Sequence, residues 1–300
     1  MYVQIHFGEI CNFRCSYCIN GNYRVPDDKY TCMSADVLAA AIEKLNNIDN
    51  ITTVGLYGGE PTVYPYIMTA VRELRAGRIT LLTNGLLCDK FVEIVNVDRK
   101  FSIDVTVHDE YWRAHRDEYA RALLVDYYVL RANRQHVNFS MKLLVDLNDM
   151  DATVDIANWL VANVDMRDVS VYHVRRTETQ EEFVKAYIAA KRRLPEVFYK
   201  KLVHTTREMA VGNPFYDKPC KQFVNYLIID ADGYVRSNLC RQAITAKQVI
   251  TDPAFSLTPC EITCNQKVIG CFDNCMYCHG LEFEDKDDVL DACGKARWDF

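Results

Sequence analysis

The first 175 residues of this 300-residue chain alternate between short β-rich runs and longer helical patterns. Strand–helix–strand units of this kind pair their strands in parallel through right-handed crossovers. Six units are too few to close an eight-stranded barrel, so the alternation predicts an α/β fold with an open parallel sheet. The expected strands are 2–7, 51–57, 78–83, 101–107, 137–145 and 169–174, and the expected helices are 34–48, 65–75, 89–95, 117–132 and 150–164.

Three motifs follow the ends of predicted strands. They are the cysteine motif Cys11–Cys18, the run Tyr57-Gly58-Gly59-Glu60-Pro61 and the run Leu82-Thr83-Asn84-Gly85. The carboxyl ends of parallel strands meet at one edge of the sheet, where ligands bind in such folds. The sequence therefore predicts one site that is built from all three motifs.

The first motif spaces Cys11, Cys15 and Cys18 as C-x3-C-x2-C. Three thiolates on a short loop can hold three irons of a four-iron, four-sulfur cluster. Four cysteines would make a closed, electron-carrying cluster, whereas an iron without a protein ligand can bind and reduce a small molecule. The alternative is a zinc site that adds a histidine such as His6, which leaves the glycines at 58 and 59 unexplained.

With Tyr17 before its third cysteine, the motif resembles the signature of the radical S-adenosylmethionine (SAM) enzymes. The run at 57–61 resembles the GGEP element of that family, and the run at 82–85 resembles its TNG element. The resemblance covers residues 2 to about 175 in the right order. It implies a partial (β/α)6 TIM-like barrel, and an open cluster whose SAM is reductively cleaved to a 5′-deoxyadenosyl radical.

The resemblance also implies cofactor-binding residues. Tyr17 and the segment Gly58-Gly59-Glu60-Pro61 would bind the cofactor, with Glu60 as the acceptor for the methionyl amino group of SAM. The alternative is a glycine turn before a helix whose first turn contains Pro61. Thr83 and Asn84 would line the SAM or substrate cavity, or form an ordinary Asn-Gly turn. Four more polar residues fall at or after strand ends that face the same site: Asp104, His108, His173 and Arg175. Arg175 could pair with the SAM carboxylate. For each of the four, a structural or solvated polar side chain without a role in the site is an equal alternative.

Eight further cysteines lie after residue 219: Cys220, Cys240, Cys260, Cys264, Cys271, Cys275, Cys278 and Cys293. The first two flank a predicted hairpin, 226–236, whose turn contains Gly233. This region resembles the SPASM extension of radical SAM enzymes, although its later gaps depart from the usual spacing. Eight thiolates suffice for two closed four-iron clusters. An open cluster, a single cluster or a zinc ribbon at Cys275, Cys278 and His279 are the alternatives.

These patterns predict three parts: a radical SAM partial barrel at 1–178, a helical bridge at 179–215 broken by Pro195, and a SPASM-like domain at 216–300. Only Cys32 and Cys88 lie outside the two cysteine groups, and free cysteines are commonly small buried residues.

Composition narrows the partners and the compartment. Hydrophobic residues make up 49% and charged residues 25% of the chain, and the net charge is −6 without a basic run. This argues against a large surface for duplex nucleic acid. No charged-then-apolar leader precedes the first strand, and no apolar stretch approaches the roughly 20 residues that span a bilayer. We expect a cytoplasmic protein whose thirteen cysteines serve metals or catalysis.

Family frequency favours modification of a peptide or protein side chain, as in the maturation of ribosomal peptides or sulfatases. The expected cofactors are SAM, one SAM-binding 4Fe-4S cluster and two auxiliary 4Fe-4S clusters. The expected electron donor is of the flavodoxin or ferredoxin type. Because the barrel begins at Tyr2, a peptide substrate would need a separate leader-peptide-binding protein or contacts from the helices at 179–210. The alternatives are radical modification of a small metabolite, sugar, nucleotide or nucleobase, and a non-enzymatic zinc protein.

Overall fold

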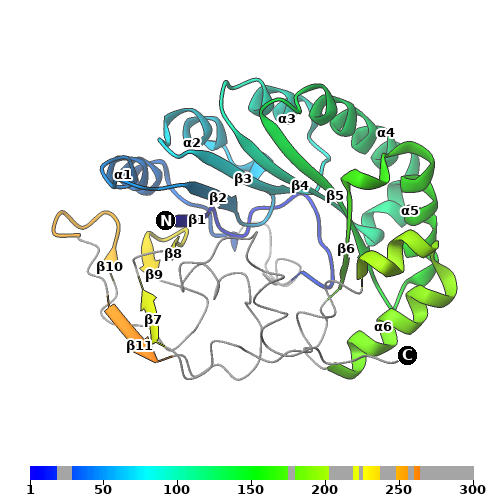
Figure 1. Ribbon diagram of the computed structural model, residues 1–300. Coiled ribbons are helices and arrows are strands. Elements are labelled where there is room, and N and C mark those ends of the chain that lie inside the picture. Colours follow the sequence, from blue (N-terminus) through cyan, green and yellow to red (C-terminus); the bar gives the residue numbers. More distant parts are fainter. Residues whose placement is uncertain are drawn as a thin grey trace.

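The computed structural model describes residues 1–18, 29–174, 180–202, 219–222, 226–236, 248–255 and 260–263 (Figure 1). Six parallel strands follow one another in sequence order, as predicted for a partial TIM-like barrel. The expected fold class is therefore confirmed. The strands are β1 Tyr2–His6, β2 Thr53–Tyr57, β3 Arg78–Thr83, β4 Phe101–Val107, β5 Val137–Val145 and β6 Val169–His173.

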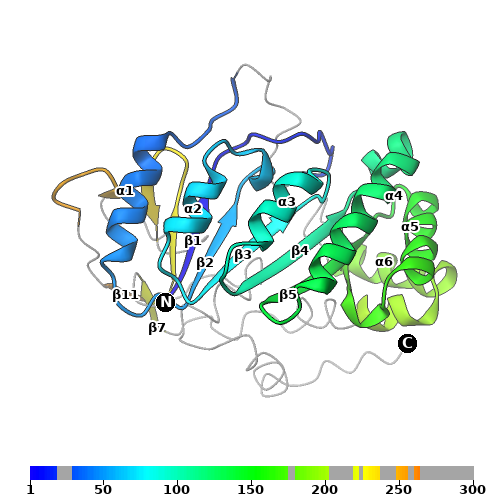
Figure 2. The ribbon, with the colours of Figure 1, turned by 90° about the horizontal axis from the view of Figure 1, so that it is seen from above.

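Helices follow these strands and lie on one side of the sheet (Figures 1 and 2). The Ser34 hydroxyl accepts a hydrogen bond from the Val37 N–H at 3.2 Å and caps the first helix, as its sequence predicts. No helix in the described part of the chain combines the length and the apolar character that crossing a bilayer requires. The helices are α1 Ala35–Asn46, η3 Pro61–Val63, α2 Ile67–Glu73, α3 Cys88–Val95, α4 Asp109–Ala132, α5 Met150–Asn163, η4 Met166–Asp168 and α6 Gln180–Arg193, followed by helical residues 196–202.

Helix α4 begins eight residues before the expected start at Asp117. His115 has non-helical angles (φ −139°, ψ 39°), so the expected helix corresponds to the segment after a kink. Tertiary contacts hold the earlier segment, because Trp112 is buried and its indole N–H donates to Asp155 Oδ2 at 2.8 Å. Local sequence does not contain this information, since Asp155 lies on α5.

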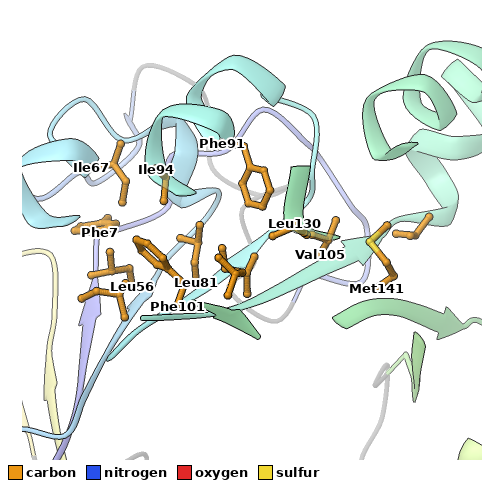
Figure 3. Close-up of a cluster of buried hydrophobic side chains, with 14 of the residues drawn as sticks. Phe7, Leu56, Ile67, Leu81, Phe91, Ile94, Phe101, Val105, Leu130 and Met141 are labelled. Atoms are coloured by element: carbon orange, nitrogen blue, oxygen red, sulfur yellow. The ribbon is translucent and has the colours of Figure 1, made fainter. Parts of the chain in front are cut away.

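The hydrophobic core fills the layer between the sheet and its helices. On β4, Phe101, Ile103, Val105 and Val107 are all buried and alternate with more exposed residues such as Asp104. Figure 3 shows Phe101 and Val105 packed with side chains of neighbouring strands and helices. Because the core occupies one face of the barrel strands, their polar residues gather on the other face.

The predicted hairpin is present and joins the barrel sheet. Strands β8 (Tyr226–Ile229) and β9 (Tyr234–Arg236) are antiparallel, and Gly233 supplies the positive φ of +83° that their turn requires. Strand β8 also pairs in parallel with β1, from Tyr2↔Tyr226 to Ile5↔Ile229. The short strand β10 (Gln248–Val249) extends the same sheet beyond β9. The order is therefore β10-β9-β8-β1-β2-β3-β4-β5-β6.

A separate two-stranded antiparallel sheet contains two of the predicted cluster cysteines. It pairs β7 (Pro219–Gln222) with β11 (Cys260–Thr263). In its register Cys220 lies opposite Ile262 and Cys260 lies opposite Gln222. The two cysteines are therefore brought together from positions 40 residues apart, as a shared metal site would require.

The core makes a direct prediction about stability. Val105→Ala removes two buried methyl groups from a 0% exposed site and should lower the free energy of unfolding by about 2 kcal/mol. The matched control is Val125→Ala on α4, where the side chain is 47% exposed and the change should stay within about 0.5 kcal/mol. Thermal unfolding of both variants followed by circular dichroism measures the difference. Equal shifts would contradict the packing described here.

Candidate active site

The cysteine loop follows β1 and is anchored by Phe13. The Phe13 ring is buried and stacks on Tyr111 with ring centroids 4.0 Å apart. The backbone N–H of Phe13 donates to Cys11 Sγ at 3.3 Å. The Cys18 N–H donates to the Cys15 carbonyl at 3.0 Å, which turns the chain between the second and third cysteines. One aromatic side chain thus fixes the loop against α4.

The environment of the loop suits metal-bound thiolates. Burial raises the pKa of Cys11 to about 11 and that of Cys15 to about 12, and the carboxylates of Glu60 and Glu110 add to these respective shifts. Such thiols lose their protons when a bound cation compensates the negative charge. Three sulfur donors on one loop are also the ligand type that iron–sulfur clusters use. The donor set therefore fits the expected cluster.

The two glycines of the GGEP run lie against the segment that leads into the cysteine loop. The Gly59 N–H donates to the Gly8 carbonyl at 2.9 Å, and the Glu60 N–H donates to the Ile10 carbonyl at 2.8 Å. A Cβ atom on Gly59 would lie 2.1 Å from the Ile10 carbonyl oxygen, and Gly58 has a φ of +147°. Only glycine permits this close backbone contact, so the glycines do more than form a turn before Pro61.

The Glu60 side chain joins three parts of the site. Its Oε1 accepts hydrogen bonds from the Thr62 N–H at 3.0 Å, the Thr62 hydroxyl at 2.6 Å and the Thr83 hydroxyl at 2.8 Å. Its Oε2 accepts from the Asn84 N–H at 2.6 Å. Burial raises the pKa of this 2% exposed carboxyl, and the bonds to the ionised form oppose that shift. The carboxylate is thus engaged by the protein itself, whereas sequence reasoning assigned it to the SAM amino group.

Asn84 connects the TNG turn to the cysteine loop. Its side-chain Nδ2 donates to Asn12 Oδ1 at 2.7 Å, and its carbonyl accepts from the Tyr119 hydroxyl at 2.7 Å. Thr83 and Asn84 are each 4% exposed. The structure brings both predicted residues to the site, where their observed contacts hold the loop. Asn12 was missed, although its position inside the cysteine motif was a usable signal.

The start of α4 contacts the loop from the other side. The Ser16 N–H donates to Glu110 Oε2 at 2.8 Å, and its hydroxyl donates to the second oxygen of that carboxylate. His108 Nδ1 lies 3.4 Å from Cys15 Sγ and 3.1 Å from the Tyr17 hydroxyl. Burial lowers the pKa of His108 to about 4. Of these contacts, sequence reasoning identified His108 and Tyr17 but not Glu110.

Two buried carboxyls lie beyond Tyr17. Burial raises the pKa of Asp109 to about 6, and the nearby negative charge of Asp146 contributes to the shift. The side chains of Asp109 and Asp146 are 0% and 1% exposed. The loop therefore lies next to acidic groups on the α4 side.

The remaining predicted residues are placed differently. Asp104 lies on the polar face of β4 and pairs with Lys142 at 2.8 Å, and Lys142 lies 4.7 Å from the Tyr172 ring centroid. His173 alternates with Tyr172 and takes a helix-facing position, so the expectation that it faces the site is wrong. Seven predicted residues lie outside the described residues: Arg175, Cys240, Cys264, Cys271, Cys275, Cys278 and Cys293.

A barrel sheet, a three-cysteine loop after its first strand, and glycine and asparagine turns packed on that loop define a radical SAM domain. The sequence model described as "Radical SAM superfamily" matches residues 5–155. The chain belongs to this superfamily and is an enzyme of that class.

Two curated relatives carry the name GTP 3′,8-cyclase. A GTP 3′,8-cyclase from Mannheimia succiniciproducens is 29% identical over 110 residues, which cover 35% of this chain and 32% of the relative. A GTP 3′,8-cyclase from Clostridium perfringens is 26% identical over 181 residues, which cover 57% of this chain and 55% of the relative. The chain therefore matches about half or less of the length of these relatives.

Solved structures share the fold at low sequence identity. The structure titled "His6 tagged anSMEcpe with bound AdoMet" gives a TM-score of 0.53 at 14% identity and covers 84% of this chain and 75% of its own. The structure of Streptococcus suis SuiB bound to the precursor peptide SuiA gives 0.52 at 14% identity, with coverages of 84% and 62%. These likenesses show the fold alone.

The hydrogen bonds of Glu60 predict the effect of an almost isosteric change. Glu60→Gln replaces one acceptor oxygen by an NH2 group that must face an N–H or hydroxyl donor, so the free energy of unfolding should fall by about 1–3 kcal/mol. Glu93→Gln is the matched control, because Glu93 makes exposed ion pairs worth about 0.5 kcal/mol or less. Thermal unfolding and iron content after reconstitution are measured together. Unchanged values for Glu60→Gln would contradict the structural role of the carboxylate.

Proposed function

We propose that this chain reductively cleaves SAM and abstracts a hydrogen atom from a peptide or protein side chain. The arrangement of the cysteine loop supports this proposal, because the sheet, the GGEP run and the TNG turn hold three thiols on one short segment. The cluster and SAM, when bound, supply a 5′-deoxyadenosyl radical.

The residues of the chain take distinct parts in this proposal. Cys11, Cys15 and Cys18 would hold the cluster and leave one of its irons open to SAM. The half-buried backbone at Gly58 and Gly59 lies next to the loop and is suited to contact the methionyl part. Glu60 and Asn84 keep that backbone and the loop in register through their hydrogen bonds. Arg175 remains the proposed partner of the SAM carboxylate.

Charge on the polar face of the sheet bears on the substrate. In the described strands, Lys142 pairs with Asp104, and Arg236 pairs with Asp230 at 2.6 Å. Arg78 takes the same face but lies at the amino end of β3, away from the cysteine loop. Because Lys142 and Arg236 are already paired with carboxylates, this face suits a neutral or zwitterionic group such as a peptide segment better than a polyanion. The fold likeness to SuiB, whose structure contains a precursor peptide, agrees with this choice.

The second candidate is radical modification of a small metabolite or nucleotide. The observation that favours it is the name of the curated relatives, GTP 3′,8-cyclase. A triphosphate substrate would need cationic groups close to the cysteine loop, and among the described strand residues Lys142 and Arg236 are already paired with carboxylates. We therefore rank this candidate second.

The C-terminal cysteines complete the proposal. We propose that residues 216–300 form a SPASM-like domain with two auxiliary 4Fe-4S clusters, and that residues 179–215 connect it to the barrel at 1–178. Cys220 and Cys260 lie on paired strands, two register positions apart, which supports a shared metal site. A flavodoxin- or ferredoxin-type donor in the reducing cytoplasm would supply the electron, and a separate protein would present the leader peptide.

The cysteine loop generates a prediction about iron content and SAM cleavage. Single changes of Cys11, Cys15 or Cys18 to alanine should lower the iron content by about four atoms per chain. They should also reduce the release of 5′-deoxyadenosine from SAM to the level of dithionite alone. Anaerobic reconstitution, iron and sulfide analysis and chromatographic product measurement test both expectations.

The control is Cys88→Ala, since Cys88 opens α3 outside the two cysteine groups. It should keep wild-type iron content and SAM cleavage. If the loop variants retain both properties, or if reconstituted protein contains zinc in place of iron and sulfide, the proposal fails and the non-enzymatic zinc alternative gains support.

A further measurement separates a peptide substrate from a nucleotide substrate. A precursor peptide encoded beside this gene should stimulate 5′-deoxyadenosine release several-fold, whereas GTP at the same molar excess should leave it unchanged. A scrambled peptide of equal composition serves as the matched control. Stimulation by GTP with a modified nucleotide as product would overturn the peptide assignment and leave the radical chemistry intact.

A further inference from the structure

His108 is the one imidazole that the described part of the site places against a cluster cysteine. It follows β4 and precedes the first residue of α4. Its ring lies nearly parallel to Tyr17 at a centroid distance of 6.0 Å and edge-on to Phe13 at 5.6 Å. Both neighbours belong to the cysteine loop, so the ring is held on two sides by the segment that it contacts.

The hydrogen-bond partners of His108 decide which atom is the donor. Nδ1 lies within reach of both Cys15 Sγ and the Tyr17 hydroxyl oxygen. A cysteine that ligates iron is a thiolate, which can only accept. A hydrogen bond between Nδ1 and this thiolate therefore requires that the ring nitrogen carries the hydrogen.

On the basis of the proposed function, we propose that the Nδ1–H of His108 donates a hydrogen bond to the Cys15 thiolate and raises the reduction potential of the SAM-binding cluster. Hydrogen bonds to ligand sulfurs are one of the factors that set cluster potentials. Reduction adds negative charge to the cluster, and a donor pointed at its sulfur stabilises that charge. His108 is therefore a positioning and tuning residue that makes the first electron transfer easier for a given donor.

Two substitutions separate the hydrogen bond from the packing. His108→Phe keeps a flat ring between Phe13 and Tyr17 but removes the N–H, so the potential should shift to a more negative value. His108→Asn loses the ring but places an amide N–H near the Nδ1 position, so the potential should stay close to that of the wild type. The reduction potential is measured by a redox titration that is monitored by electron paramagnetic resonance. The signal that changes when SAM is added belongs to the SAM-binding cluster, so its titration distinguishes this cluster from any other.

A measurement on the wild-type fold covers the case in which a variant does not assemble. Protein labelled with 15N at histidine should show, in pulsed paramagnetic resonance of the reduced cluster, a 15N coupling transmitted through the hydrogen bond to sulfur. His108→Asn should lose that coupling while keeping the potential.

The outcomes separate this inference from the proposed function. Equal potentials in His108→Phe and the wild type, equal shifts in both variants, or no 15N coupling in the wild type would each overturn the role of His108. A wild-type protein without any SAM-sensitive cluster signal would instead overturn the proposed function. A negative shift in His108→Phe alone, together with the coupling, supports the inference.

Discussion

The site depends on one buried carboxylate. Glu60 accepts four hydrogen bonds that tie the end of β3 and the 3-10 turn after β2 to each other, while its own N–H bonds to the segment that enters the cysteine loop. Removing a carboxylate from water costs free energy unless its oxygens accept hydrogen bonds from the protein. Both oxygens of Glu60 accept such bonds. The same residue therefore fixes the relative position of all three sequence motifs.

This arrangement gives the glycine-rich run two separate tasks. Its backbone approaches the loop so closely that a methyl group at position 59 would collide with the Ile10 carbonyl. Its one acidic side chain turns inward and holds the neighbouring strand end. In the proposed function, contacts to SAM would then fall to main-chain groups, whose positions do not depend on side-chain rotamers. A rigid main-chain cradle suits a cofactor that must be held in one orientation.

Much of the barrel could be predicted from sequence, because its strands carry strong local signals. The bounds of β3, β4 and β5 agree with the expected ranges, since β-branched and aromatic residues on these strands alternate with polar ones. Interactions between distant residues could not be predicted. The role of Glu60 depends on donors 23 and 24 residues away, and the first segment of α4 depends on Asp155. The pairing of β8 with β1 had a signal that was not used: Tyr226–Ile229 is an uninterrupted apolar run, as buried parallel strands often are.

The junction of β8 with β1 has a consequence for electron movement. Strand β1 leads straight into the cysteine loop, and the neighbouring strand opens the hairpin that Cys220 and Cys240 bracket in sequence. Tunnelling rates fall exponentially with the gap between donor and acceptor. Main-chain hydrogen bonds between β1 and β8 join the cysteine loop to the hairpin. Paired strands hold the distance between these two regions more firmly than a flexible linker does. Any redox centre bound beside the hairpin would thus exchange electrons with the loop across a span set by secondary structure.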